Sequence, residues 1–300
     1  MVETGKKITK GRRGDLIFHL ALLAWPLLQF AVFYVAVNLN SFKLAFEKPL
    51  GGTGWSDNFK YIFSATVLPD ILKSVLTSIE FYAITTVVSV PLGLLFAYYI
   101  YKKAIGSKLF RFSLFLPSII SGMVMVVLFQ FFMEQGLLDV LNTNKAVFNL
   151  NLRSSYVYII IFYIWINFGT TTLIYSNKMG EMPPETIEAA ELDGANSFQE
   201  FFHIVLPFAF PTVSVFLVTG IATLFTNQYN LFSFFGGTIA FDPGTMGYYL
   251  FTRVQELASN GNFESFEYNR AAALSLVVTV IIVPVTLTVR WLTEKYGPQD

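Results

Sequence analysis

Long apolar runs alternate with polar segments along this chain, at positions 16–37, 75–101, 112–133, 156–177, 205–226 and 271–292. Each run reaches about the 20 residues that a helix needs to cross the hydrocarbon core of a bilayer. The runs lack the polar alternation of a β-barrel strand, and an open sheet would leave backbone groups unpaired in lipid. The pattern predicts an all-α, polytopic membrane protein with six transmembrane helices.

The composition supports a lipid environment. Hydrophobic residues make up 54% of the 300 and charged residues only 13%, which is about half the roughly 25% of a soluble domain. The net charge is zero, so the basic footprint of a nucleic-acid-binding protein is missing. Basic residues precede the first run, as in a signal peptide, but no small-residue cleavage pattern follows. We therefore expect a retained span.

The distribution of Lys and Arg predicts that both termini are cytoplasmic. With the N-terminus inside, twelve of the twenty Lys and Arg fall in inner segments, although the outer segments contain more residues. This topology makes 1–15 and 293–300 cytoplasmic tails of a transmembrane domain that covers 16–292. It also places the loop 178–204 inside, although this loop carries one Lys and six carboxylates. Such a departure from the positive-inside rule indicates a role other than topology.

The acidic loop predicts a helix, a glycine elbow and a second helix that leads into the fifth span. Pro183-Pro184 suits a helix start, because a proline in the first turn loses no hydrogen bond. Asp193-Gly194 suits the end of that helix, since Gly adopts the left-handed conformation of a C-terminal cap. Ser197 and Glu200 have the spacing of a capping box, and Pro207 predicts a break before the span.

The loop resembles the EAA loop of bacterial ABC importer permeases. Glu188–Ala190 reads EAA, Gly194 follows after three residues, and Ile204-x-Leu206-Pro207 follows after nine more. The DGA at Asp193–Ala195, with the preceding Pro183, resembles the carbohydrate-uptake branch, of the maltose and glycerol-phosphate permease type. The basic N-terminus and the TEKYG tail resemble the first permease subunit of such transporters. The large outer domain of the maltose subunit is missing here, because the 38–74 loop is short.

The resemblance implies that 178–204 is a cytoplasmic coupling-helix loop seated in a cleft of a partner ATPase. The ATPase-coupling residues carried over are Glu188, Ala189, Ala190, Asp193 and Gly194. Further implied partners are two cytoplasmic ATPase subunits that bind ATP and Mg, a second homologous permease subunit in a heterodimer, and an extracellular or periplasmic sugar-binding protein. The location implied is the bacterial inner or plasma membrane. An amphipathic surface helix that merely connects two spans is the alternative.

The chain carries no sign of its own energy source. No Walker A sequence is present, so ATP hydrolysis is expected from a partner chain, and no cofactor is expected in this one. The ionisable side chains within the spans are His19, Glu80 and Arg290. Ion-coupled carriers keep such groups at membrane depth, whereas His19 and Glu80 fall near span ends, where an interfacial position explains them.

Polar residues of the fourth and fifth spans are candidates for a substrate pathway. Tyr163, Asn167 and Thr170 share one helical face, and Thr226–Asn230 interrupts an apolar segment. Amides beside aromatic rings suit the hydroxyl groups and apolar faces of sugars. The candidate residues are Tyr163, Asn167, Asn227, Thr223, Asn230 and Gln130. Polar residues also join membrane helices to one another, so helix packing stays open as the alternative role for each.

These features predict a permease subunit that moves a sugar or oligosaccharide into the cell by alternating access. An ABC importer permease for another solute, such as an amino acid, a peptide or a polyol phosphate, is the alternative. A membrane-embedded enzyme is disfavoured, because His19 and His203 lie far apart and the chain has neither Cys nor an H-E-x-x-H motif. We expect neither catalytic nor metal-binding residues. A receptor or assembly scaffold would differ from a transporter in not stimulating ATP hydrolysis.

Overall fold

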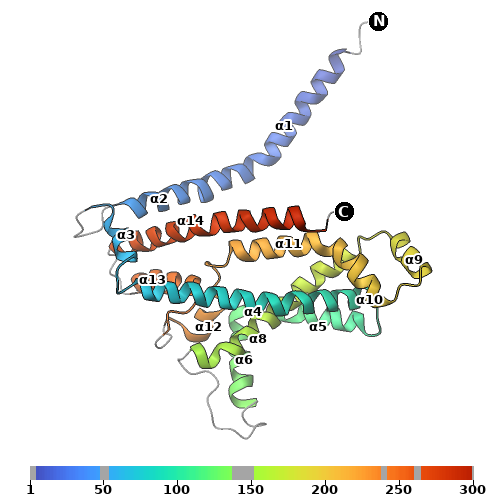
Figure 1. The fold of residues 1–300 in the computed structure, drawn as a ribbon. Helices are drawn as coiled ribbons and strands as arrows, with labels where there is room; N and C mark the ends of the chain where they lie inside the picture. The colour runs from blue at the N-terminus through green and yellow to red at the C-terminus, as the bar shows by residue number, and fades with distance from the viewer. Residues whose placement is uncertain (1–4, 48–53, 137–151, 238–241, 260–264, 299–300) are drawn as a thin grey trace. The chain divides into compact units, whose positions relative to one another are not determined.

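The computed structural model describes residues 5–47, 54–136, 152–237, 242–259 and 265–298, and every regular element in these ranges is helical (Figure 1). The elements are α1 (Gly5–Gln29), the π-helical turn η1 (Phe30–Ala36), α2 (Val37–Phe46), α3 (Asp57–Ile62), α4 (Leu68–Tyr101), α5 (Ser107–Ile119), α6 (Gly122–Phe131), η2 (Phe132–Gly136), α8 (Leu152–Met179), α9 (Pro184–Leu192), α10 (Ser197–Glu200), η3 (Phe201–Val205), α11 (Leu206–Ala222), α12 (Leu231–Phe235), α13 (Met246–Ser259) and α14 (Ser265–Tyr296).

The chain divides into two compact units, of which the first comprises residues 1–61 and 264–276. Within this unit the Asn58 side-chain amide donates to the carbonyls of Ala45, at 3.1 Å, and Glu47, at 3.0 Å. The Arg270 guanidinium lies 3.5 Å from the centre of the Tyr61 ring. These contacts join the end of α2 to α3, and α3 to the start of α14.

The second unit comprises residues 62–263 and 277–300 and contains the helices that matter for function. Its long helix α4 packs along α8, while α5 packs on α8 and α11 contacts both α4 and α8. The approach of α5 to α8 depends on Gly169, since a Cβ added there would lie 1.9 Å from the carbonyl oxygen of Leu114. A small residue allows two membrane helices to approach this closely.

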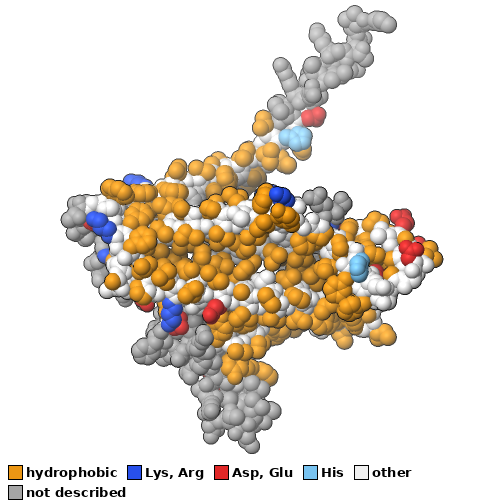
Figure 2. All heavy atoms as spheres, in the orientation of Figure 1, with side chains coloured by type: hydrophobic (Ala, Val, Ile, Leu, Met, Phe, Trp, Pro, Cys, Tyr) orange, Lys and Arg blue, Asp and Glu red, His pale blue; other side chains and the backbone are white. Residues whose placement is uncertain are grey.

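Five helical segments in the described residues are long and apolar enough to cross a membrane, or six if a bent pair counts as one span. The bent pair replaces the expected straight third span, because the backbone at Ile120 and Ser121 is extended and α5 and α6 meet at 104°. The predicted all-helical membrane fold is confirmed. Hydrophobic side chains spread over the sides of α4 and α11, whereas carboxylates gather at α9 (Figure 2).

Candidate functional site

The helix α9 presents one face to the bundle and the other to the exterior. It begins at Pro184, after Pro183 in the N-cap position, and ends at Leu192, with Asp193 as its C-cap. Gly194 has φ +80° and no atom within 4 Å of a Cβ added there. The left-handed elbow therefore favours Gly for its backbone conformation rather than for lack of space. Ile187 is buried against the bundle, whereas Glu188 and Ala189 are exposed.

Ala190 lies on the inner face of α9, where it is buried. The resemblance carries over both alanines of the EAA sequence as coupling residues, and of the two only Ala189 is exposed. Leu192, which is 89% exposed, was not among the predicted coupling residues, and Phe198 on the other side of the elbow is 73% exposed. A leucine just before the glycine turn of an acidic loop was the available signal.

The capping box of the second helix lies one residue earlier than the sequence predicted. The Asn196 side-chain oxygen accepts from the backbone N–H groups of Phe198 and Gln199, and the Gln199 side chain accepts from the Asn196 N–H. The prediction of Ser197 and Glu200 was wrong because Asn196 serves as the cap. Glu200 therefore has no capping role, and its side chain is buried.

Lys102, which directly follows α4, ties this second helix to the bundle. Its Nζ lies 2.8 Å from a carboxylate oxygen of Glu200 and 3.6 Å from one of Glu191. Burial alone would lower the pKa of Lys102, but the hydrogen bond and the negative charge of Glu200 raise this pKa by more. The Tyr98 hydroxyl adds a 3.3 Å hydrogen bond to the carbonyl of Ser197.

Pro207 does not break the chain before the fifth span. The helical run continues from Ser197 to Ala222, with the π-helical turn η3 between α10 and α11. Pro207 lies at the start of α11, directly after the π-helical turn η3. The loop 178–204 therefore passes into the fifth span through a continuous helical run.

A packed apolar cluster connects α9 to the interior of the bundle. It joins α9, α4, α8, η3 and α11 through Leu94, Ala97, Tyr175, Met179, Met182, Ile187, Phe201, Val205, Ala209 and Val213. Tyr175 has no exposed surface and also lines the cavity described next. The cluster therefore runs from α9 to the cavity wall.

A cavity of about 250 Å³, which we call the span cavity, lies between α4, α8 and α11. Its lining residues are Tyr82, Thr85, Thr86, Ser89, Val90, Tyr163, Ile164, Asn167, Phe168, Thr171, Tyr175, Phe216, Leu217, Gly220, Thr223, Asn227 and Tyr229. None carries an acidic or basic side chain. The cavity wall thus combines hydroxyls, amides and aromatic rings.

Hydrogen bonds fix the polar groups of the span cavity. The Asn227 amide donates to the Tyr163 hydroxyl at 2.8 Å, and the Asn227 side-chain oxygen accepts from the Tyr229 N–H at 2.9 Å. Asn167 donates to the Tyr163 carbonyl at 2.9 Å. The Tyr163 and Tyr229 rings lie 4.6 Å apart. A direct side-chain bond therefore links α8 to the segment that follows α11.

A family model described as "Binding-protein-dependent transport system inner membrane component" matches residues 89–298, which is more than two thirds of the chain. The match covers the loop 178–204 and the cavity residues of α8 and α11. The chain belongs to this family. The permease is accordingly a multi-pass inner-membrane component and not itself an enzyme, and ATP is bound by a partner ATPase of the transport system.

Several curated proteins resemble the permease over most of its length. The "Arabinooligosaccharides transport system permease protein AraP" of Halalkalibacterium halodurans is 26% identical over 250 residues, covering 79% of the permease and 76% of AraP. The "Probable ABC transporter permease protein YesP" of Bacillus subtilis is 30% identical over 247 residues, covering 77% and 74%.

A solved bacterial ABC transporter involved in alginate import contains a chain with the same fold. It matches the permease with a TM-score of 0.73 at 19% identity, covering 96% of the permease and 99% of that chain. The likeness extends over the whole helical arrangement.

The structure brings four of the six predicted pathway residues to the span cavity, namely Tyr163, Asn167, Thr223 and Asn227. The other two lie elsewhere. Gln130 donates to the carbonyl of Phe234 at 3.2 Å, and Asn230 holds a left-handed turn with φ 61° at the start of α12. Both positions are typical of side chains that support packing or a turn.

Sequence reasoning missed the contribution of α4 to the cavity. Tyr82, Thr85, Thr86 and Ser89 line it at helical spacing along the second span, and this spacing of polar residues in an apolar run was the available signal. The Tyr82 hydroxyl donates to the carbonyl of Leu217 at 3.0 Å.

Proposed function

We propose that the permease imports a neutral sugar or oligosaccharide by alternating access, driven by ATP hydrolysis in the partner ATPase. The uncharged lining of the span cavity is the observation that carries this proposal. Amino acids, peptides and polyol phosphates carry charges, and a buried charge needs a paired charge or strong hydrogen bonds to compensate its desolvation. Sugar hydroxyls and ring faces suit the hydroxyl, amide and aromatic groups that line this cavity. The name of the relative AraP points to the same substrate class.

The Tyr175 hydroxyl is a further polar group suited to a sugar hydroxyl. It is buried and has no hydrogen-bond partner among the described residues, although the side chain lines the cavity. A buried polar group without a partner costs roughly 1–3 kcal/mol. A helix movement that opens the cavity to this hydroxyl would let a sugar hydroxyl bond to Tyr175 without breaking an existing hydrogen bond.

The size of the span cavity requires movement during transport. Its volume of about 250 Å³ lies below the roughly 300–1,000 Å³ of most small-molecule sites. An oligosaccharide passes only if α4, α8 and α11 move apart, or if a second permease subunit supplies the other wall. We propose a related but distinct permease chain in this role, in a heterodimer with two ATPase subunits and an external sugar-binding protein.

The exposed face of α9 is proposed to dock on the ATPase. Glu188, Ala189 and Leu192 form a face with an acidic side chain, a small one and a large apolar one. Such a face fits a cleft with a basic residue beside an apolar pocket, where a desolvated Leu provides an anchor. Both termini and this loop then lie in the cytoplasm.

The substrate class is tested by reconstituting the complete transporter and measuring ATP hydrolysis stimulated by its binding protein. We expect stimulation by neutral mono- or oligosaccharides, and none by amino acids, peptides or glycerol phosphate. Stimulation by a charged solute alone would overturn the assignment to neutral sugars, while leaving the family membership intact.

The coupling role is tested at the elbow with Gly194→Asp and the matched Gly194→Asn. Asn and Asp both tolerate the left-handed conformation, and open space surrounds this position, so the two variants differ chiefly in the added negative charge. We expect Gly194→Asp to assemble but to lose stimulation of ATP hydrolysis, and Gly194→Asn to retain most of it. Normal stimulation in Gly194→Asp would contradict the coupling role of the loop.

A further inference from the structure

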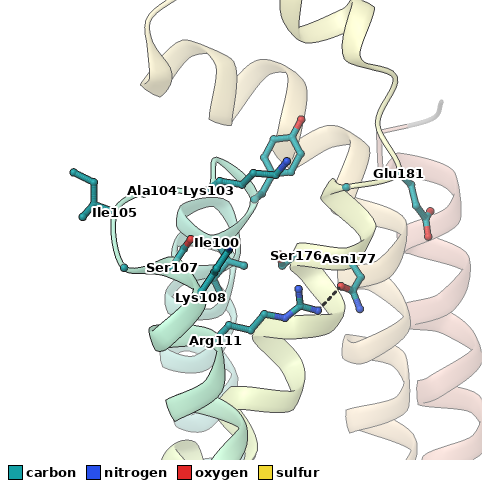
Figure 3. Close-up of a pocket in the computed structure, with 13 residues that line it drawn as sticks. Ile100, Lys103, Ala104, Ile105, Ser107, Lys108, Arg111, Ser176, Asn177 and Glu181 are labelled. Carbon is teal, nitrogen blue, oxygen red and sulfur yellow. Dashed lines mark hydrogen bonds between the residues drawn. The ribbon is translucent and has the colours of Figure 1, made fainter.

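A second cavity, of about 810 Å³, lies where α4 ends and α5 begins, beside the end of α8 (Figure 3). We call it the basic cavity, because Lys103, Lys108 and Arg111 line it together with Ser176 and Asn177. The end of α8 leads directly into α9, so the basic cavity lies at the same membrane face as the coupling loop. It is separate from the span cavity and shares no lining residue with it.

The positive charge of the basic cavity is not balanced by carboxylates. Within the described residues, no salt bridge joins Lys103, Lys108 or Arg111 to an acidic side chain. Arg111 donates a long, 3.4 Å hydrogen bond to the neutral Asn177 amide oxygen, as Figure 3 shows. The one carboxylate in the lining, Glu181, lies 3.1 Å from the Lys178 ammonium. Three cations thus face a cavity that suits an anion.

Exposed apolar side chains lie beside the basic cavity. The cavity lies at the ends of two candidate membrane spans, which finish at Tyr101 and Gly180. Beside the cations, Ile105 is 99% exposed, Leu109 is 72% exposed and Phe112 is 64% exposed. Cations at the end of a span above exposed apolar side chains match a phosphate group that carries acyl chains.

We propose that the basic cavity binds the phosphate of an anionic phospholipid in the leaflet that faces the coupling loop. Lys108 and Arg111 contact the phosphate, and the exposed face of α5 contacts the acyl chains. Phosphatidylglycerol keeps a net negative charge, whereas the choline ammonium of phosphatidylcholine cancels the charge of its own phosphate. The cavity therefore selects anionic over zwitterionic lipid, independently of the sugar proposed above.

Native mass spectrometry of the assembled transporter in detergent, titrated with phosphatidylglycerol, tests this proposal. Each basic residue near a membrane surface contributes about 1 kcal/mol to attraction of anionic lipid, which corresponds to about fivefold in affinity. We expect Lys108→Gln and Arg111→Gln each to weaken the tightest lipid binding about fivefold. Arg111→Lys retains the charge and is expected to retain binding.

The matched control is Lys295→Gln, which removes a cation that lies over the Trp291 ring and outside the basic cavity. We expect it to leave the tightest binding unchanged. The proposal is overturned if Lys295→Gln weakens binding as much as Lys108→Gln, or if phosphatidylcholine binds as tightly as phosphatidylglycerol. Displacement of the lipid by equimolar glycerol phosphate would also overturn it, and would assign the cavity to a soluble phosphate instead. A thermal unfolding midpoint equal to that of the wild type confirms that each variant is folded.

Discussion

The ion pair between Lys102 and Glu200 is predicted to fix the coupling loop to α4. In Lys102→Met, the Glu200 carboxylate loses the ammonium that lies 2.8 Å away. Removing one partner of a fully buried pair costs roughly 3–5 kcal/mol. The Glu200 side chain is 3% exposed but that of Lys102 is 31% exposed. Because water reaches the cation, we expect a smaller loss of about 2 kcal/mol in the free energy of unfolding.

Thermal unfolding and ATP hydrolysis of the assembled transporter measure the two consequences. A loss of this size lowers the unfolding midpoint by roughly 4 °C. A loop no longer tied to α4 moves without it, so we expect stimulation by the liganded binding protein to fall about fivefold or more. Basal hydrolysis is expected to stay unchanged, since it takes place in the ATPase.

The double variant Lys102→Met/Glu200→Leu distinguishes a lost pair from a lost side chain. Replacing both members of a buried pair by apolar residues is often neutral for stability, so we expect the unfolding midpoint to recover. Lys60→Met is the control, because its pair with Asp57 is largely solvated, with Lys60 72% exposed. We expect Lys60→Met to lower the free energy of unfolding by less than about 1 kcal/mol. Equal stability of Lys102→Met and the wild type would refute the structural role of the pair.

The pH dependence follows from the raised pKa of Lys102. Burial would lower this pKa from 10.5, but the hydrogen bond and charge of Glu200 outweigh burial and raise it. A group whose pKa is raised by folding contributes its full stability below the unfolded value, and loses it as pH rises through the folded value. The stability difference between Lys102→Met and the wild type should therefore be constant from neutral pH to about pH 10. A difference that shrinks between pH 7 and 9 would contradict this assignment.

Three further substitutions probe the cavity, the helix packing and the docking face. Tyr163→Phe removes the hydroxyl that accepts the 2.8 Å bond from Asn227, and we expect sugar uptake to fall about two- to tenfold. Gly169→Ala places a Cβ 1.9 Å from the carbonyl oxygen of Leu114, so the free energy of unfolding should fall by about 1–3 kcal/mol or more. Leu192→Ser changes a side chain that is 89% exposed, so the subunit should unfold as the wild type does while its affinity for the ATPase falls about tenfold.

Each of these substitutions has a control. Gln130→Ala removes an amide outside the span cavity, and a fall in sugar uptake equal to that of Tyr163→Phe would contradict the assignment of the cavity. Gly237→Ala adds a Cβ in open space, and a cost equal to that of Gly169→Ala would contradict the packing argument. An unchanged affinity of Leu192→Ser for the ATPase, measured by co-purification, would remove the docking role of the exposed leucine.

The sequence predicted the features that depend on local chemistry. Apolar runs of membrane length have few alternatives to helices, so the all-helical fold follows from them. The bounds of α9 follow from Pro184 and Gly194, whose backbone preferences act without help from distant residues. The bend between α5 and α6 was missed, because it arises from the extended backbone of two ordinary residues, Ile120 and Ser121.

The positions that the sequence did not predict depend on contacts between distant segments. Asn196 and Ser197 are both good capping residues, and the choice between them accompanies the burial of Glu200 against Lys102, far away in sequence. The sequence did not predict that α4 lines the span cavity, because the polar residues of α4 are spread along a continuous apolar run. Asn227 and Asn230 belong to the same polar interruption, yet their backbones differ, so one reaches the cavity and the other holds a turn.

Packing around Tyr175 joins α9 to the span cavity. Tyr175 belongs to the cluster that contains Ile187 of α9, and it also lines the cavity. A Cβ on Gly93 would already touch the Tyr175 ring at 3.4 Å, so α4 holds this ring closely. Protein interiors are close-packed and do not deform continuously. A displacement of α9 must therefore either break the cluster or move α4, α8 and α11 with it, and the second outcome changes the shape of the cavity.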